Sequence, residues 1–192
     1  MLFDIWRIPT MTYYGGKELA ASFRTVRGNT LQIARDIPET QYAFAAAPDV
    51  RPVGKILVHI ALSPGFQMYM HQNSVTDMTK VPFMDLLAKF GEEEAKTRNK
   101  AEIVAFLESE GEKFASYVEG LPESFLAEIV TMMPGTQPAV RSRLEMLLSP
   151  KEHEMHHRGQ LMLVERMLGI VPHLTRQFQE RMAAREAAPA GR

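Results

Sequence analysis

Apolar side chains recur along the chain at spacings of three and four residues, which is the period of an amphipathic α-helix. The clearest run begins at Leu19 and ends at Ile37, directly before Pro38, so the sequence predicts a first helix that stops there. The stripe consists of Leu19, Phe23, Val26, Thr30, Ile33 and Ile37. No segment shows a strand-type alternation of apolar and polar residues that competes with this helical pattern. The pattern therefore predicts an all-α protein.

The second long helix is expected to start near Asp49, a good N-cap, with Pro52 in its first turn. Pro64 lies inside this helix and cannot donate a backbone hydrogen bond, so a bend is expected there. The inner stripe of the second helix reads Pro52, Ile56, His59, Ser63, Phe66 and Met70.

The third long helix is expected to end at Gly120, which matches a glycine C-cap, and the fourth to run from about Ala139 to Leu168. The irregular stretch 128–138 between them predicts a crossover loop. Shorter helices are expected at 83–90 and 173–187. Four long helices with connections of mixed length predict a four-helix bundle with extra short helices.

Length and composition favour one globular domain over residues 1–192, with a core of about 16–170 and a helical tail over 171–192. Lys and Arg number 22 against 23 Asp and Glu, so the chain lacks the basic field that nucleic acid requires, and no nucleic-acid partner is expected. The chain has no cysteine, which excludes disulfides, zinc fingers, iron–sulfur ligation and thiolate nucleophiles.

The first ten residues lack the pattern of a signal peptide, and no stretch is apolar for long enough to cross a membrane. The expected location is therefore the cytoplasm. The apolar residues Phe3, Ile5 and Trp6 are expected to fold over the bundle or over a partner subunit.

Three histidines stand at positions where apolar side chains are expected. The stripe of the fourth helix contains His153 and His157, one turn apart, and the second helix contributes His59. Burying an imidazole without a partner costs about 1–3 kcal/mol, and a shared divalent metal would remove that cost. Three protein ligands leave a position for water or substrate, which is typical of catalytic sites. The alternative is that these are ordinary core histidines. Within the metal hypothesis, His156 could replace His157 as the second ligand, because it lies three residues after His153.

The remaining histidines, His71 and His173, are expected to be surface residues. Glu154 follows His153 by one residue and so points about 100° away from it, which predicts a solvent-exposed carboxylate. The segment from His153 to His157 also matches the zincin pattern H-E-x-x-H, but no strand pattern supports the sheet of such a protease.

The run His153 to Gln160, read as H-x-x-x-H-R-G-Q, resembles the DinB-like superfamily, which includes YfiT-type proteins and thiol-dependent S-transferases. The resemblance also rests on the apolar context of His59, in Leu57-Val58-His59-Ile60, and covers about Leu19 to Leu168 in helix order. The charged stretch 92–100 and the tail after Gly169 are not part of it, and Pro150 is expected to kink the fourth helix just before the first ligand.

The resemblance implies an up-down-down-up four-helix bundle, commonly a homodimer, that holds nickel or zinc on His59, His153 and His157. It further implies a small-molecule substrate and chemistry on low-molecular-weight thiols, which here would be cosubstrates because the chain has no cysteine. Two hypotheses follow: a metal-dependent thiol S-transferase or hydrolase, or a non-catalytic stress or binding protein whose metal is structural or absent.

Next to the second ligand, Arg158 and Gln160 are either polar partners of the site or ordinary surface residues. Gly159 costs about 1 kcal/mol in the middle of a helix relative to alanine, and it is expected to permit the close approach of another helix.

Overall fold

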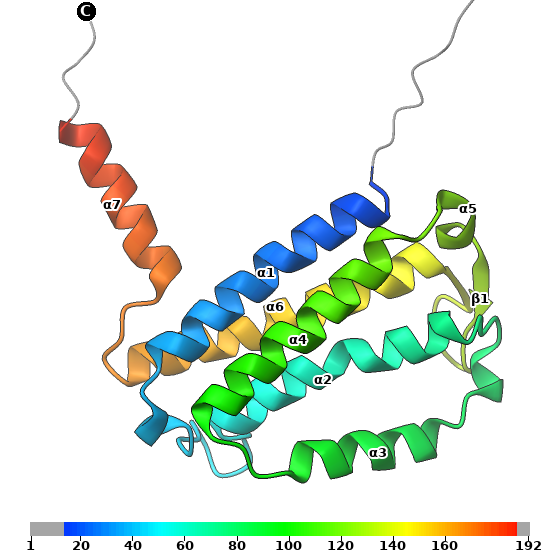
Figure 1. Ribbon diagram of the computed structural model, residues 1–192, viewed down its shortest axis with the longest axis horizontal. Coiled ribbons are helices and arrows are strands. Elements are labelled where there is room, and N and C mark those ends of the chain that lie inside the picture. The colour runs from blue at the N-terminus through cyan, green and yellow to red at the C-terminus, as the bar shows by residue number, and fades with distance from the viewer. Residues whose placement is uncertain (1–13, 188–192) are drawn as a thin grey trace, which may run out of the picture.

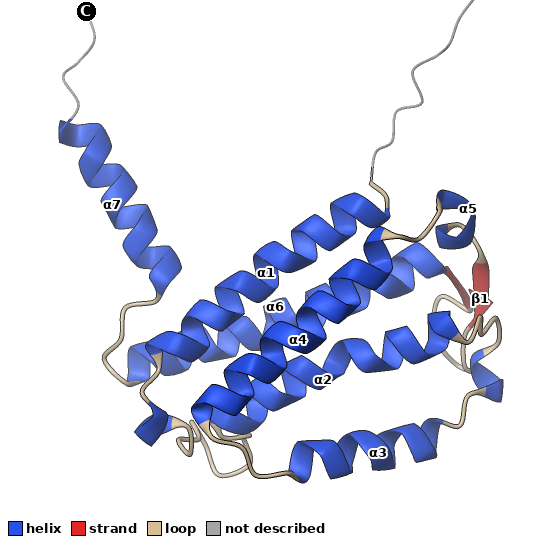
Figure 2. Cartoon of the chain, viewed as in Figure 1, coloured by secondary structure: helices blue, strands red, loops and turns tan. Residues whose placement is uncertain are grey.

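The structure is a computed structural model that describes residues 14–187, and it confirms the predicted four-helix bundle (Figures 1 and 2). The four long helices are α1 (Gly16–Asp36), α2 (Val53–Gln72), α4 (Lys100–Glu119) and α6 (Arg143–Met167). The shorter elements are α3 (Phe83–Ala95), α5 (Glu123–Leu126), α7 (His173–Ala187), the 3₁₀ turns Glu39–Gln41 and Met78–Lys80, and the strands β1 (Ile129–Thr131) and β2 (Val140–Ser142). Phe3, Ile5 and Trp6 lie outside the described residues.

The helices run up, down, down and up, as the resemblance implies. Helix α1 is antiparallel to α4 and parallel to α6, whereas α2 is antiparallel to α6. The contacts that fix these directions are Arg24–Glu112 and Arg35–Glu108 between α1 and α4, Ser22–Lys151 and Arg27–Glu154 between α1 and α6, and His59–His153 and His71–Arg143 between α2 and α6.

Helix α3 makes this order of helices possible. Because α2 and α4 point the same way, the chain must travel back along the bundle between them, and α3 covers that distance beside α2 (Figure 1). The antiparallel direction of α3 follows from two contacts: the ring of Phe83 packs on Phe66, and Glu94 pairs with Arg51 at the other end. The crossover therefore places α3 along the outside of α2.

The interior is filled by apolar side chains from all four long helices. At one end of the bundle they form a cluster around Ile33, Leu57, Leu107 and Leu161, and at the other end a cluster around Phe23, Phe114 and Leu147. Gly16 allows α1 to approach α4, because a Cβ atom at this position would lie 2.4 Å from the carbonyl oxygen of Val118.

Two helix starts differ from the predictions. Helix α2 begins at Val53 with Pro52 as its N-cap, not near Asp49, because a residue that precedes proline is disfavoured in the helical conformation and Arg51 precedes Pro52. Helix α6 begins at Arg143, not at Ala139, and the hydroxyl of Ser142 accepts a hydrogen bond from the backbone of Glu145 as its N-cap.

The predicted crossover loop over 128–138 contains part of a small antiparallel hairpin. Strand β1 pairs with β2, with Val130 opposite Arg141, and the short helix α5 precedes β1. Each strand has only three residues, too few for alternation to appear in the sequence.

The other boundaries agree well with the predictions. Helix α4 has Gly120 as its C-cap, and α7 spans His173–Ala187 as predicted, while α3 continues about one turn past the predicted end. Pro64 and Pro150 are buried inside helices that continue through them. Among residues 14–187, none of the helices combines the length and the apolar character that crossing a bilayer requires.

Candidate metal centre

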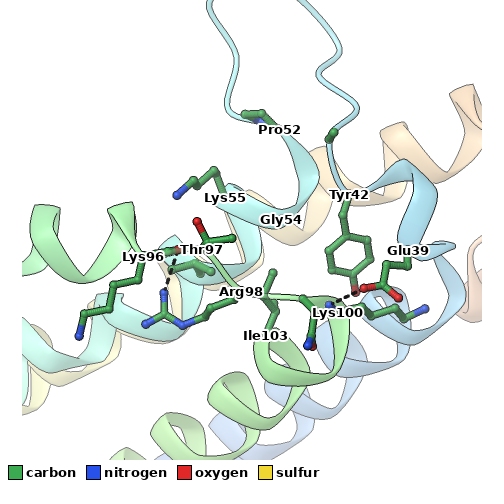
Figure 3. Close-up of a pocket in the computed structure, with 13 residues that line it drawn as sticks. Glu39, Tyr42, Pro52, Gly54, Lys55, Lys96, Thr97, Arg98, Lys100 and Ile103 are labelled. Carbon is green, nitrogen blue, oxygen red and sulfur yellow. Dashed lines mark hydrogen bonds between the residues drawn. The ribbon is translucent and has the colours of Figure 1, made fainter.

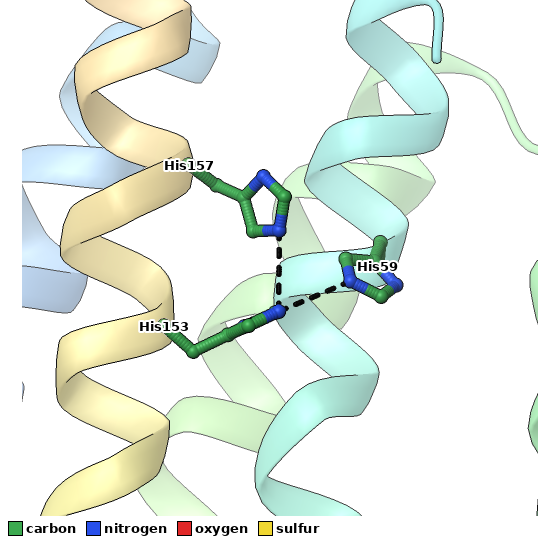
Figure 4. A group of neighbouring side chains, drawn as sticks. All are labelled: His59, His153 and His157. Atoms are coloured by element: carbon green, nitrogen blue, oxygen red, sulfur yellow. Dashed lines mark hydrogen bonds between the residues drawn. The ribbon is translucent and has the colours of Figure 1, made fainter. Parts of the chain in front are cut away.

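The three predicted histidines meet between α2 and α6 (Figure 4). The Nε2 atom of His153 lies 3.2 Å from the Nε2 atom of His59 and 3.2 Å from that of His157. The candidate ligand atoms of the three side chains all lie within 4.8 Å of one another. Two neighbouring helices therefore direct three imidazole nitrogens toward one point.

This arrangement fits a metal better than it fits hydrogen bonding among the rings. A neutral imidazole nitrogen carries either one hydrogen or one lone pair, so Nε2 of His153 cannot satisfy both neighbours at once. Nitrogens that bind one zinc ion at about 2.1 Å with angles between 90° and 109° lie roughly 3.0–3.4 Å apart. The two separations that involve His153, 3.2 Å each, fall within that range, and all three ligand atoms lie within 4.8 Å of one another.

The outward-facing nitrogens of two ligands have oxygen partners. Nδ1 of His157 lies 2.7 Å from the side-chain oxygen of Gln160, and Nδ1 of His59 lies 3.5 Å from a carboxylate oxygen of Glu94. An oxygen acceptor places the hydrogen on Nδ1 and leaves the lone pair on Nε2, which is the tautomer that binds metals through Nε2. Nδ1 of His153 is buried without a hydrogen-bond partner among the described residues.

Glu94 is itself held in place from α2. Its carboxylate accepts a hydrogen bond of 2.9 Å from Nε of Arg51, and its backbone carbonyl accepts one of 2.6 Å from Nζ of Lys55. Arg51, Glu94 and His59 thus form a chain of contacts that leads from the surface to the candidate ligand set. The sequence analysis missed Glu94, because it lies in a charged run that has the pattern of a solvated face.

Burial keeps the three imidazoles neutral. Removal from water lowers the pKa of each ring, and for His153 burial and the neighbouring His157 and His59 lower the pKa to about 4. Arg51 adds to the lowering at all three rings. Neutral rings with inward lone pairs are the form that binds a divalent cation.

The histidines lie at the rim of the bundle and not at its centre. All three are partly exposed, whereas the residues that fill the centre of α6 are Leu147, Pro150, Glu154 and Leu161. The inner stripe predicted for α6 is therefore displaced by about one residue from the observed one. The rim position leaves the three side chains partly exposed to solvent.

The prediction that Glu154 is exposed was wrong. Its side chain is fully buried and accepts hydrogen bonds of 2.9–3.0 Å from Nε and Nη2 of Arg27, while Nη1 of Arg27 donates to the carbonyl of Leu107 at 2.5 Å. The carboxylate thus faces α1 and α4, away from the histidines. It cannot serve as the general base of a zincin, so the H-E-x-x-H match does not mark a protease site, although its two histidines are candidate metal ligands.

Two further histidines also differ from the predictions, because His71 and His173 are buried. Nδ1 of His71 lies 3.1 Å from Nη1 of Arg143, and burial lowers its pKa to about 4. Nε2 of His173 lies 3.1 Å from the side-chain oxygen of Asn29. Each has a structural role at one end of the bundle, and neither reaches the candidate metal centre.

Among the residues that follow His157 in α6, Gln160 contacts this candidate ligand through its side chain, whereas Arg158 and Gly159 do not. Gln160 contacts His157 through its oxygen and His156 through its nitrogen at 3.2 Å, so His156 faces this amide and is not grouped with the ligands. Arg158 lies on the side of α6 that faces His173, whose pKa it helps to lower. Gly159 is exposed, and a Cβ atom there would meet nothing within 4 Å, so the close approach expected of it does not occur within the described chain.

A separate cavity of about 430 Å³ lies at the amino-terminal end of α2, between that helix and α4 (Figure 3). Its lining includes four cationic side chains, Lys55, Lys96, Arg98 and Lys100, above an apolar floor that contains Val58 and Ile103. None of the three histidines lines it. The candidate metal centre is therefore separate from this cavity.

Solved structures with the same fold support this description. A DinB-like protein from Bacillus subtilis, YjoA, matches with a TM-score of 0.59 and 18% identity, over 79% of this chain and 92% of that chain. YfiT from the same organism, described as a probable metal-dependent hydrolase with an unusual four-helix bundle topology, matches with a TM-score of 0.62 and 13% identity, over 81% and 88% of the two chains. At these identities the likeness establishes the fold alone.

Sequence comparison identifies the family. None of the curated proteins matches this chain. The model of the DinB superfamily, however, matches residues 22–161, which include all three clustered histidines and more than half of the chain. From α1 to the middle of α6, this protein belongs to the DinB superfamily.

Proposed function

We propose that this protein is a metal-dependent enzyme that binds one divalent ion, nickel or zinc, through Nε2 of His59, His153 and His157 and acts on a small electrophilic substrate. The single observation that carries the proposal is the convergence of three imidazole nitrogens: Nε2 of His153 lies 3.2 Å from Nε2 of both His59 and His157, and all three side chains are partly exposed. The name of YfiT, a structural relative described as a probable metal-dependent hydrolase, supports the same class of chemistry.

A divalent ion at this point supplies Lewis-acid chemistry, which lowers the pKa of a coordinated water or thiol and polarises an electrophile. The protein contributes the geometry. Helix α6 presents His153 and His157 one turn apart, α2 presents His59 opposite them, and Glu94 and Gln160 keep two of the rings in the Nε2-binding tautomer. Three protein ligands leave coordination positions for the reactants.

Hydrolysis and thiol transfer are both compatible with this ligand set. Because the chain has no cysteine, a thiol must arrive as a cosubstrate, and no covalent thioester or disulfide with the protein can form. The competing proposal is a non-catalytic protein whose metal has no exchangeable position. A cobalt-substituted protein separates the two: a change in its visible spectrum on addition of a thiol supports the enzyme, and no change with any small ligand supports the non-catalytic protein.

The first test of the proposal is metal content. Elemental analysis of protein purified without chelator, with nickel and zinc supplied, is expected to give about one divalent ion per chain. His59→Ala and His153→Ala should each lose it, whereas His156→Ala should retain it, because His156 lies beside the ligand set and contacts Gln160. A wild-type protein without metal, or equal loss in His156→Ala, would contradict the proposal.

The cytoplasmic location expected from the sequence remains a prediction. The homodimer that the resemblance implies likewise remains a prediction.

A further inference from the structure

Helix α7 leaves the bundle and has no partner within the described chain along most of its length. Figure 1 shows it pointing away from the four long helices. Every residue from Gln177 to Ala187 is exposed. The match to the family model ends at residue 161, before this helix begins, so α7 lies outside the matched residues.

The base of α7 is firmly attached, which fixes the direction of the helix. His173 is buried against Asn29, the guanidinium of Arg176 binds the carboxylate of Asp36 at 2.6 Å, and Arg166 donates to the hydroxyl of Thr175 at 3.1 Å. With these contacts in place, the exposed part of α7 cannot fold back onto the α6 helix of its own chain.

Helix α7 carries an apolar ridge that begins at the partly buried Leu174 and continues along the exposed part. Leu174, Phe178 and Met182 follow one another at intervals of four residues, and Phe178 is 57% exposed. A helix of this length is marginally stable alone in water, and a bare phenylalanine and methionine make isolation less favourable still. The ridge therefore requires a surface that covers it.

The outer face of α6 presents a matching ridge. Met155, Gly159, Leu163 and Met167 are all exposed and also lie at intervals of four residues, and Leu163 is 59% exposed. Gly159 has no neighbour where a Cβ would lie, so it forms a notch between Met155 and Leu163. The α6 ridge spans about 18 Å and the α7 ridge about 12 Å, so one fits along the other. Ridges at four-residue intervals interdigitate in the commonest class of helix packing.

We infer that α7 is an exchanged arm, whose ridge covers the α6 ridge of a second copy of this chain. The two ridges belong to the same polypeptide and are therefore present in equal numbers. A dimer with a two-fold axis covers the α6 ridge and the α7 ridge of both chains. Each dimer then contains two contacts between an α7 ridge and an α6 ridge. A specific interface buries at least about 1,000 Å² in total, so the two contacts together with their polar neighbours have to supply an area of that order. The arm then supports the outer face of the helix that carries His153 and His157.

The absence of cysteine allows a clean test of this arm exchange. Phe178→Cys and Leu163→Cys are prepared as two separate proteins, mixed, and treated with a short bismaleimide. Because each chain has one thiol, a covalent 178–163 product can form only between two chains. Met84→Cys, which replaces a side chain that is 73% exposed on α3, takes the place of Leu163→Cys in the control mixture. We expect at least tenfold more product from the 178–163 mixture than from the control.

Mass in solution provides the second measurement. Light scattering is expected to give twice the chain mass of 21.7 kDa for the wild type and the mass of one chain for Phe178→Glu and for Leu163→Glu. Circular dichroism checks that both variants remain helical. A wild-type monomer, a dimer that persists in both variants, or equal crosslinking in the two mixtures would overturn the exchange.

Discussion

Glu94 is the residue that connects the crossover helix to the candidate metal centre. It reaches Nδ1 of His59 from α3 while Arg51 holds its other carboxylate oxygen. A carboxylate behind a ligand histidine fixes the orientation of the ring and increases the basicity of the ligating nitrogen. Glu94 is thus a positioning residue, one step removed from the metal.

We expect Glu94→Gln to weaken metal affinity about tenfold, because an amide is a poorer acceptor than a carboxylate for Nδ1–H. Isothermal titration with zinc measures the change. Glu92→Gln, an exposed residue on the same helix, is the matched control and should leave the affinity unchanged. Equal affinities in the wild type and Glu94→Gln would show that the 3.5 Å contact has no effect on the metal.

Glu165 is a buried carboxylate whose oxygens have no hydrogen-bond partner within residues 14–187. Burial, with the negative charge of Asp36 nearby, raises its pKa to about 7. An acid whose folded-state pKa is raised contributes its full stability below the unfolded pKa, and this contribution is lost as the pH rises through 7.

We therefore expect Glu165→Gln to stabilise the protein at pH 8 by up to about 3 kcal/mol relative to its effect at pH 4.5. Urea unfolding at the two pH values, in the presence of a chelator, measures the difference. Glu152→Gln, on the exposed face of α6, should show no such dependence. Parallel pH profiles for the wild type and Glu165→Gln would contradict the assignment.

At the scale of the helices, one guanidinium joins all four members of the bundle. Arg27 extends from α1, binds Glu154 of α6 through two nitrogens, and donates to the carbonyls of Leu107 in α4 and Ile60 in α2. Gly111 leaves room for it, because a Cβ atom there would lie 2.8 Å from Nη1 of Arg27. This ion pair sets the rotation of α6 and so the direction of the neighbouring His153.

Removal of either partner leaves the other charge buried. We expect Arg27→Met and Glu154→Leu each to lower the free energy of unfolding by about 3–5 kcal/mol, and the double variant to recover most of the loss. Urea denaturation of the four proteins forms a double-mutant cycle. Additive losses in the double variant would show that the two side chains do not act as a pair.

The comparison of sequence with structure is also clearest at this scale. The long helices and the three ligands could be predicted, because helical periodicity and the spacing of His153 and His157 are local properties. The buried role of Glu154 could not be predicted. A stripe drawn through the histidines places this residue on the exposed face of α6, whereas its side chain is in fact buried in the core. Glu94 was missed for a different reason, since its partner His59 lies 35 positions away on another helix.

At the scale of the whole molecule, the candidate site joins α2 to α6, two of the four long helices that form the core. Metal binding should therefore stabilise the entire bundle. At a metal concentration one hundred times the dissociation constant, the gain is about 2.7 kcal/mol, or roughly 5–10 °C in the unfolding temperature for a chain of this size.

Thermal unfolding with and without zinc measures this gain. His153→Ala should show no shift with metal, and His156→Ala should show the full shift. A shift of the same size in His153→Ala would place the bound metal elsewhere in the protein.

The crossover helix α3 has one more consequence, for how such a protein can diverge. The four long helices hold the core and the histidines, whereas α3 buries only Leu86 and lies outside α2. Its sequence can accordingly change with little cost to folding, yet it supplies Glu94 to His59. Natural variation or laboratory selection confined to residues 83–95 would thus alter the surroundings of a candidate ligand on an unaltered scaffold.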